Sequence, residues 1–118
     1  MQTNTLSKQT ARIGLIGLGL MGNRLTQRLQ VSGWNIQAWN RSPEPSRAMA
    51  LKGIPIAESI AALLAGSEVV LSSLANDAAV ESVYLGPGGV LSAAKPGTVL
   101  LEMSTISPQL SLRLHQRA

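Results

Sequence analysis

The chain has 118 residues, 45% of them hydrophobic, and no cysteine. This length fits a single domain with its own core, and the lack of cysteine excludes disulfides and thiolate chemistry; we predict no metal site. The net charge is +4, but the basic residues are scattered and aromatic residues make up only 3%. We therefore expect no nucleic-acid partner. No apolar stretch resembles a signal peptide or a membrane span, so we expect a cytoplasmic protein with no membrane partner.

The first elements in the chain form a strand, a glycine-rich turn and a helix. Residues 1–11 are polar, and we expect them to be disordered; residues 12–118 are the predicted domain. A buried strand is expected at 12–16, then Gly17-x-Gly19-x-x-Gly22, then a helix at 23–32. A second strand at 34–39 leads into Asn40-Arg41-Ser42.

Strands and helices continue to alternate beyond that point. Asp77 can cap a helix, and Ser59 and Ser107 precede two others as cap residues. Alternation of this kind implies right-handed crossovers and a parallel sheet. The sequence therefore predicts a Rossmann-type doubly wound α/β fold with about five strands. The remaining predicted helices lie at 45–52, 59–65, 78–84, 90–94 and from 108 onward, and the remaining strands at 54–57, 68–74 and 98–102.

The glycine pattern is the strongest functional signal. It follows a predicted strand and opens a predicted helix, which is the context that gives this motif its meaning. Gly17 would make the turn, Gly19 would let the backbone approach a pyrophosphate, and Gly22 would allow close packing of helix and strand. The helix start attracts the anion. We predict a dinucleotide site that includes Leu18, Leu20 and Met21.

The residues at the end of the second predicted strand indicate which dinucleotide the chain binds. NAD sites usually carry Asp or Glu there, to bind the ribose 2′-OH. This chain has Asn40, followed by Arg41 and Ser42. A guanidinium would attract a 2′-phosphate, which a carboxylate would repel. The sequence predicts NADP, with NAD as the alternative, and the opposing interpretation is that Arg41 is a solvated loop residue.

Two further loops leave the same edge of the sheet. Ser104 and Thr105 follow the last predicted strand and offer two hydroxyls, which could bind a substrate carboxylate or a nicotinamide amide or could merely cap the next helix. Leu74 and Ala75 follow the preceding strand, where the backbone could pass beside the cofactor.

Four motifs in order resemble the β-hydroxyacid dehydrogenase family: I-G-L-I-G-L-G-L-M-G, W-N-R-S-P, a valine- and glycine-spaced stretch from Leu74 to Leu91, and E-M-S-T-I-S-P. The family includes 3-hydroxyisobutyrate dehydrogenase, tartronate semialdehyde reductase and 6-phosphogluconate dehydrogenase. The resemblance covers residues 12–118. It implies that Leu74, Ala75 and Thr105 line the nicotinamide half of the cofactor and that Ser104 binds the substrate carboxylate.

The resemblance also implies parts that these residues lack. The family's proton-transferring lysine lies on a later helix, and an all-helical domain follows it and usually makes a homo-oligomer. None of Lys8, Lys52 and Lys95 has a matching context, so no catalytic residue is assigned. Glu102 stands where the family more often has Asp, and Ala75 where many members have Pro. A small carboxylic acid is expected as substrate only if the C-terminal domain is supplied.

Three functions are open at this point. The first is the NADP-binding domain of a 3-hydroxyacid dehydrogenase, which passes hydride between the nicotinamide and a small 3-hydroxy acid or its semialdehyde. The second is a non-catalytic dinucleotide-binding or scaffold module with the same fold. The third is a fragment of an imine reductase, against which the S-T-I-S-P motif argues because it suits a carboxylate substrate.

Overall fold

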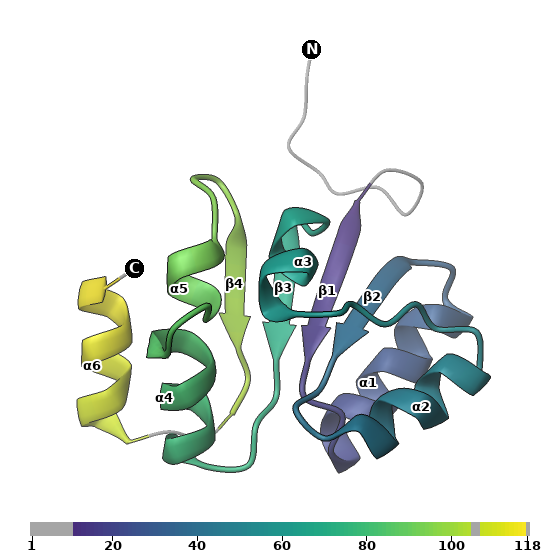
Figure 1. Ribbon diagram of the computed structural model, residues 1–118, viewed down its shortest axis with the longest axis horizontal. Helices are drawn as coiled ribbons and strands as arrows, with labels where there is room; N and C mark the ends of the chain where they lie inside the picture. The colour runs from purple at the N-terminus through teal and green to yellow at the C-terminus, as the bar shows by residue number, and fades with distance from the viewer. Residues whose placement is uncertain (1–10, 105–106, 118) are drawn as a thin grey trace.

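A computed structural model describes residues 11–104 and 107–117 (Figure 1). The predicted disordered segment lies outside the described residues except for Ala11, which is buried. The described chain is an α/β fold, with helices on both faces of one parallel sheet. The predicted fold class is therefore confirmed.

The sheet has four parallel strands in the order β2-β1-β3-β4. In sequence they are β1 (Arg12–Ile16), β2 (Asn35–Trp39), β3 (Val69–Ser72) and β4 (Val99–Glu102). β1 lies at the centre and pairs with β2 on one side and with β3 on the other. All the carboxyl ends of the strands therefore meet at one edge, at the lower end of the sheet in Figure 1.

The strand predicted at 54–57 is only a single bridge, between Ile56 and Ala38. Two backbone hydrogen bonds hold this segment beside β2, from the Ala38 N–H to the Pro55 carbonyl and from the Ala57 N–H to the Ala38 carbonyl. Pro55 has no N–H with which to extend the ladder. The sheet consequently has one strand fewer than predicted.

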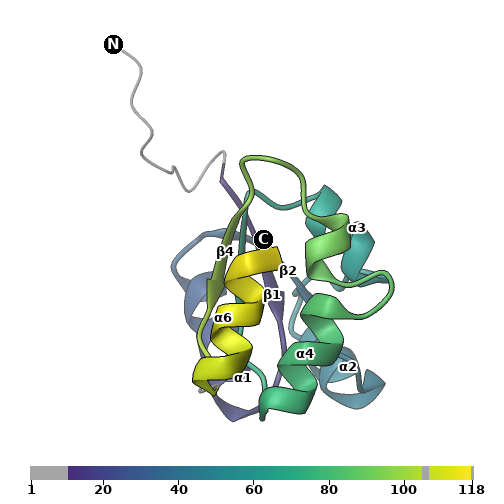
Figure 2. The same cartoon turned by 90° about the vertical axis from the view of Figure 1, so that its left-hand side faces the viewer.

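Two core clusters pack against the two faces of the sheet. Met49 and Ile54 pack with Leu15 and Ala38 on the face that α1 and α2 cover. The larger cluster joins β1 and β3 to the other four helices, and Figure 2 shows α3 and α4 together on one side of the sheet. The helices are α1 (Leu20–Val31), α2 (Pro43–Leu51), α3 (Ile60–Ala65), α4 (Asp77–Leu85), α5 (Val90–Ala93) and α6 (Pro108–Arg117).

Two of the three predicted helix caps are present. The Ser59 hydroxyl accepts from the Ala62 N–H at the start of α3, and the Ser107 hydroxyl accepts from the Leu110 N–H in α6. The cap predicted at Asp77 is wrong, because α4 begins one residue earlier and Asn76 caps it. The Asp77 carboxylate instead accepts from the Ser107 N–H (2.9 Å), which connects the starts of α4 and α6. The Ser107 side chain and, to a smaller extent, this N–H lower the pKa of Asp77.

One side of β4 carries apolar side chains that the described chain leaves open. Val99 and Leu101 are each 48% exposed, and Met103 just beyond the strand is 43% exposed. Leu100, on the opposite side of β4, packs against the larger core cluster. Within the described ranges, no helix is long and apolar enough to cross a membrane.

Candidate functional site

A pocket of about 250 Å³ lies at the carboxyl edge of the sheet. Its walls come from the loops after β1, β2 and β3 and from the inner side of α4. It brings together residues separated by more than sixty positions in the sequence. The lining residues are Gly17, Gly19, Trp39, Asn40, Arg41, Ser42, Ser73, Leu74, Ala75, Ala79 and Val83.

The three glycines of the loop have different reasons to lack a side chain. Gly17 has φ +96°, and a Cβ there would lie 2.1 Å from the Ser73 carbonyl oxygen. A Cβ on Gly22 would lie 2.0 Å from the Gly17 carbonyl oxygen, so this glycine lets the helix pack closely on the turn. A Cβ on Gly19 would meet no atom within 4 Å, and Gly19 lines the pocket. The open space above Gly19 therefore fits a ligand that approaches the backbone.

The start of α1 also faces this loop. Gly19 is the N-cap residue, no side chain caps the helix, and the first turn contains no acidic residue. Leu20 and Met21 are 73% and 58% exposed. Amide groups and the positive end of the helix dipole thus lie beside the glycine turn, which is the usual arrangement for holding a phosphate.

Asn40 has a structural role that the sequence did not reveal. Its side-chain oxygen accepts from the Leu18 N–H (2.8 Å), and its amide donates to the Ser42 carbonyl (3.0 Å). The Leu18 side chain is 3% exposed and belongs to the core. Asn40 therefore ties the end of β2 to the glycine loop, and any contact of Leu18 with a ligand has to come from its backbone.

Arg41 crosses from the end of β2 toward α4. Its guanidinium donates a hydrogen bond to the Ser82 hydroxyl, and both residues are exposed. Arg41 and Ser42 line the pocket beside Trp39. Among the described residues that line it, Arg41 is the only charged one, so the pocket is electrostatically suited to an anion.

The loops after β3 and β4 meet at the other end of the site. The Leu74 N–H donates to the Ser104 hydroxyl oxygen (2.5 Å), and the Ser104 N–H donates to Glu102 Oε1 (2.5 Å). Ala75 is exposed and lines the pocket. The structure thus brings Leu74, Ala75 and Ser104 together. Thr105, predicted to act with them, lies outside the described residues.

A polar network missed at the sequence level lies behind this junction. The Ser72 hydroxyl donates to Glu102 Oε2 (2.6 Å) and also bonds the Tyr84 hydroxyl (2.5 Å). Ser72 and Tyr84 are buried. Burial raises the pKa of Tyr84 well above its ordinary value, and the nearby Glu102 carboxylate adds to the rise. Ser72 and Tyr84 lie in segments that the sequence predicts only as a strand and a helix, and no sequence signal marks either residue as part of a site.

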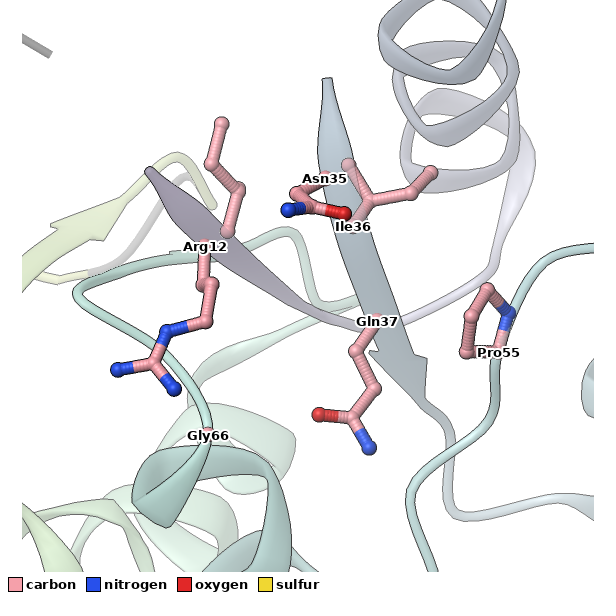
Figure 3. Close-up of a pocket in the computed structure, with 7 residues that line it drawn as sticks. Arg12, Asn35, Ile36, Gln37, Pro55 and Gly66 are labelled. Carbon is pink, nitrogen blue, oxygen red and sulfur yellow. The ribbon is translucent and has the colours of Figure 1, made fainter. Parts of the chain in front are cut away.

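A second pocket, of about 230 Å³, lies at the opposite edge of the sheet, where Arg12 and Asn35 begin β1 and β2 (Figure 3). Gln37, Pro55 and Gly66 also line it. None of the residues predicted for a site lies there. No group of three or more His, Asp or Glu side chains suited to a metal occurs in the part of the chain that the structure describes.

The fold and the glycine loop at the carboxyl edge of the sheet define a dinucleotide-binding domain of Rossmann type. The chain belongs to the family described as the NAD-binding domain of 6-phosphogluconate dehydrogenase, whose model matches residues 12–118. It is an NAD(P)-binding domain of the 3-hydroxyacid dehydrogenase type. The predicted family resemblance is therefore confirmed.

Two of the similar proteins are named as dehydrogenases, and each is about three times as long as this chain. The chain is 36% identical to 2-(hydroxymethyl)glutarate dehydrogenase of Eubacterium barkeri over 107 residues, which is 91% of this chain and 36% of that protein. It is 34% identical to the probable mitochondrial 3-hydroxyisobutyrate dehydrogenase-like 3 of Arabidopsis thaliana, covering 91% of this chain and 34% of that one. The chain thus spans about a third of the length of these relatives.

Solved structures agree with the fold. The structure of Psf3 in complex with NADP+ and 2-OPP superposes with a TM-score of 0.84 at 32% identity, over 89% of this chain and 37% of that one. An imine reductase from Pseudomonas sp. superposes with a TM-score of 0.75 at 26% identity, over 91% and 36% of the two chains.

Proposed function

We propose that the chain binds NADP in preference to NAD, as the nucleotide-binding domain of a dehydrogenase for small 3-hydroxy acids. The observation that carries this is the charge of the pocket at the end of β2, where Arg41 is the only charged side chain among the described lining residues. Asn40 occupies the place at which an NAD site usually has a carboxylate. The neighbouring structure that contains NADP+ supports the preference.

In this proposal, the loops at the carboxyl edge of the sheet hold different parts of the cofactor. The backbone at Gly19 and the start of α1 would take the pyrophosphate, and Arg41 would take the 2′-phosphate as a planar, charged donor. The nicotinamide half would then extend across β1 toward the loops after β3 and β4, because the ribose of the adenosine lies at β2. Leu74 and Ala75 line the pocket on that side, and the Ser104 hydroxyl is hydrogen-bonded to the Leu74 N–H.

The bound nicotinamide would supply hydride transfer to or from the substrate carbon. The described chain contributes binding and orientation. Ser104 carries a hydroxyl suited to a carboxylate oxygen, which favours a hydroxy acid over an imine as substrate. Lys52 and Lys95 do not line the pocket, so neither is proposed as the proton-transferring group.

Titration of Arg41→Ala with NADP and NAD tests the proposal. Loss of a charge-assisted contact to a phosphate should raise the Kd for NADP about 10- to 100-fold and the Kd for NAD by less than about 2-fold. Arg113→Ala is the matched control, because Arg113 pairs with Glu81 on the surface (2.9 Å) and does not line the pocket. Equal losses for both cofactors in Arg41→Ala, or a wild type that prefers NAD, would overturn the proposal.

A further inference from the structure

The Ser104 loop is held from behind by one carboxylate. Glu102, the last residue of β4, accepts the Ser104 N–H at Oε1 and the Ser72 hydroxyl at Oε2. Ser72 ends β3, so this carboxylate joins the ends of two neighbouring strands. Glu102, Ser72 and Ser104 are not lining residues of the pocket, but Ser104 is hydrogen-bonded to the N–H of Leu74, which is. Glu102 can therefore act on a ligand through Ser104 and the Leu74 loop.

Counting protons fixes the direction of every hydrogen bond in this network. Ser72 has one hydroxyl proton, which it donates to Glu102. The bond between Ser72 and Tyr84 must therefore be donated by Tyr84. A chain of donors thus runs from Tyr84 through Ser72 to the carboxylate, and the second carboxylate oxygen remains for the Ser104 N–H.

The same counting defines what Ser104 offers to a ligand. Its hydroxyl oxygen accepts from the Leu74 N–H, which leaves the hydroxyl proton to be donated elsewhere. Held in this way, the Ser104 hydroxyl keeps one proton that it can donate to a ligand. It suits an acceptor oxygen, such as that of a carboxamide or a carboxylate.

We propose that Glu102 is a positioning residue that, with Ser72 and Tyr84, sets the Ser104 hydroxyl as a donor to an acceptor oxygen at the nicotinamide end of the site. The inference rests on the proposed function, because it needs a dinucleotide whose adenosine half lies at β2. The acceptor oxygen belongs to the nicotinamide carboxamide or to a small carboxylate bound beside it.

The experiment compares ligands that reach Ser104 with one that does not. Adenosine 2′,5′-bisphosphate carries the adenosine half alone, NADPH adds the nicotinamide, and 3-hydroxypropanoate offered to the NADP-saturated chain adds a carboxylate. Glu102→Leu removes both acceptors of the network. The Kd for NADPH or for 3-hydroxypropanoate should rise about 5- to 10-fold, which is the equivalent of one hydrogen bond. The Kd for the bisphosphate should rise by less than about 2-fold.

Glutamine at the same position should restore binding. In Glu102→Gln the side-chain oxygen can still accept from the Ser104 N–H while its NH2 donates to Ser72, whose proton then turns to Tyr84. We expect affinities within about 2-fold of wild type. Adding Tyr84→Phe removes the acceptor for that proton, so the double variant should lose affinity where neither single variant does. Tyr84→Phe removes only one hydroxyl group, so the double variant keeps the test available if Glu102→Leu fails to fold.

Glu81→Leu is the matched control, because Glu81 is a half-buried glutamate of α4 that pairs with Arg113 away from the pocket. The ligand that loses affinity identifies the acceptor oxygen. Weaker binding of NADPH indicates the carboxamide, and weaker binding of 3-hydroxypropanoate indicates a carboxylate. The inference is overturned if both arms are unchanged in folded Glu102→Leu or in the Glu102→Gln/Tyr84→Phe double variant, or if the bisphosphate weakens equally. If the wild type fails to bind the bisphosphate, the proposed function itself is wrong.

Discussion

The two ends of the site are built by different means. At the β1–β2 end, the shape comes mainly from backbone: the turn at Gly17, the open position at Gly19 and the start of α1. The Asn40 side chain ties this loop to the end of β2. At the β3–β4 end, the shape comes from side chains, because Glu102 and Ser72 join the two strand ends.

The difference teaches what each end can tolerate. A site made of backbone depends on the absence of side chains, so almost any substitution at its glycines changes it. A site made of a hydrogen-bond network depends on the balance of donors and acceptors, so an isosteric change that keeps the balance can be neutral. Substitutions at the two ends should therefore behave differently.

The largest effect is expected for Gly17→Ala. The new Cβ would lie 2.1 Å from the Ser73 carbonyl oxygen at a residue with φ +96°. Backbone strain and overlap with a fixed backbone atom should lower the free energy of unfolding by about 3 kcal/mol or more. Urea unfolding followed by circular dichroism measures this, and a loss below about 1 kcal/mol would mean that the turn can relax.

Gly19→Ala sharpens the comparison, because the same chemical change two residues later meets no atom within 4 Å. The Gly19 backbone, with φ −68° and ψ −168°, also suits alanine. Stability should change by less than about 0.5 kcal/mol. The methyl group would occupy the space where a pyrophosphate approaches the backbone, so the Kd for NADP should rise about 10-fold or more. Unchanged affinity would mean that the cofactor does not approach Gly19.

The smallest effect concerns Tyr84 at high pH. Its pKa is raised above the ordinary value of 10.0 by burial, so near pH 10 the unfolded chain ionises while the folded chain does not. The contribution of Tyr84 to the free energy of unfolding is therefore complete below pH 10. Above pH 10 this contribution falls by about 1.4 kcal/mol per pH unit. Tyr84→Phe should remove this part of the pH dependence of urea unfolding.

Because Tyr84 is the only tyrosine, its absorbance at 295 nm reports its ionisation directly. In the folded wild type, absorbance should begin to rise only well above pH 10. A midpoint at the ordinary value would show that the hydroxyl is not buried in the network.

Much of the fold could be predicted from the sequence. The strand at 12–16 was placed to the residue, and the caps at Ser59 and Ser107 are present, because these features depend on apolar runs and on hydroxyls that bond a neighbouring turn. The bridge at Ile56 and the cap at Asn76 were misjudged. The bridge depends on which segment lies beside Ile56 in space, and the cap depends on a one-residue difference in where α4 begins. A local sequence pattern determines neither.

The candidate site also has parts that the sequence predicts and parts that it does not. The sequence predicts the glycine loop and Asn40-Arg41-Ser42 as site residues because each lies at a fixed distance from the end of a strand, and several of these residues line the pocket. The tie from Asn40 to Leu18 spans 22 positions, and the Ser72–Glu102 contact spans 30. Contacts this distant arise only when parallel strands bring their carboxyl ends to one edge, and a serine or tyrosine within apolar segments carries no sign of its future partner.

The class of protein, the glycine turn and the positive charge at the end of β2 follow from spacing along one continuous segment, so they can be predicted from the sequence. How the loops after β3 and β4 are joined, through Ser72, Glu102 and Ser104, becomes visible only in the folded chain. The physical reason is that a hydrogen-bond network is defined by the relative positions of donors and acceptors, which exist only once the sheet has formed.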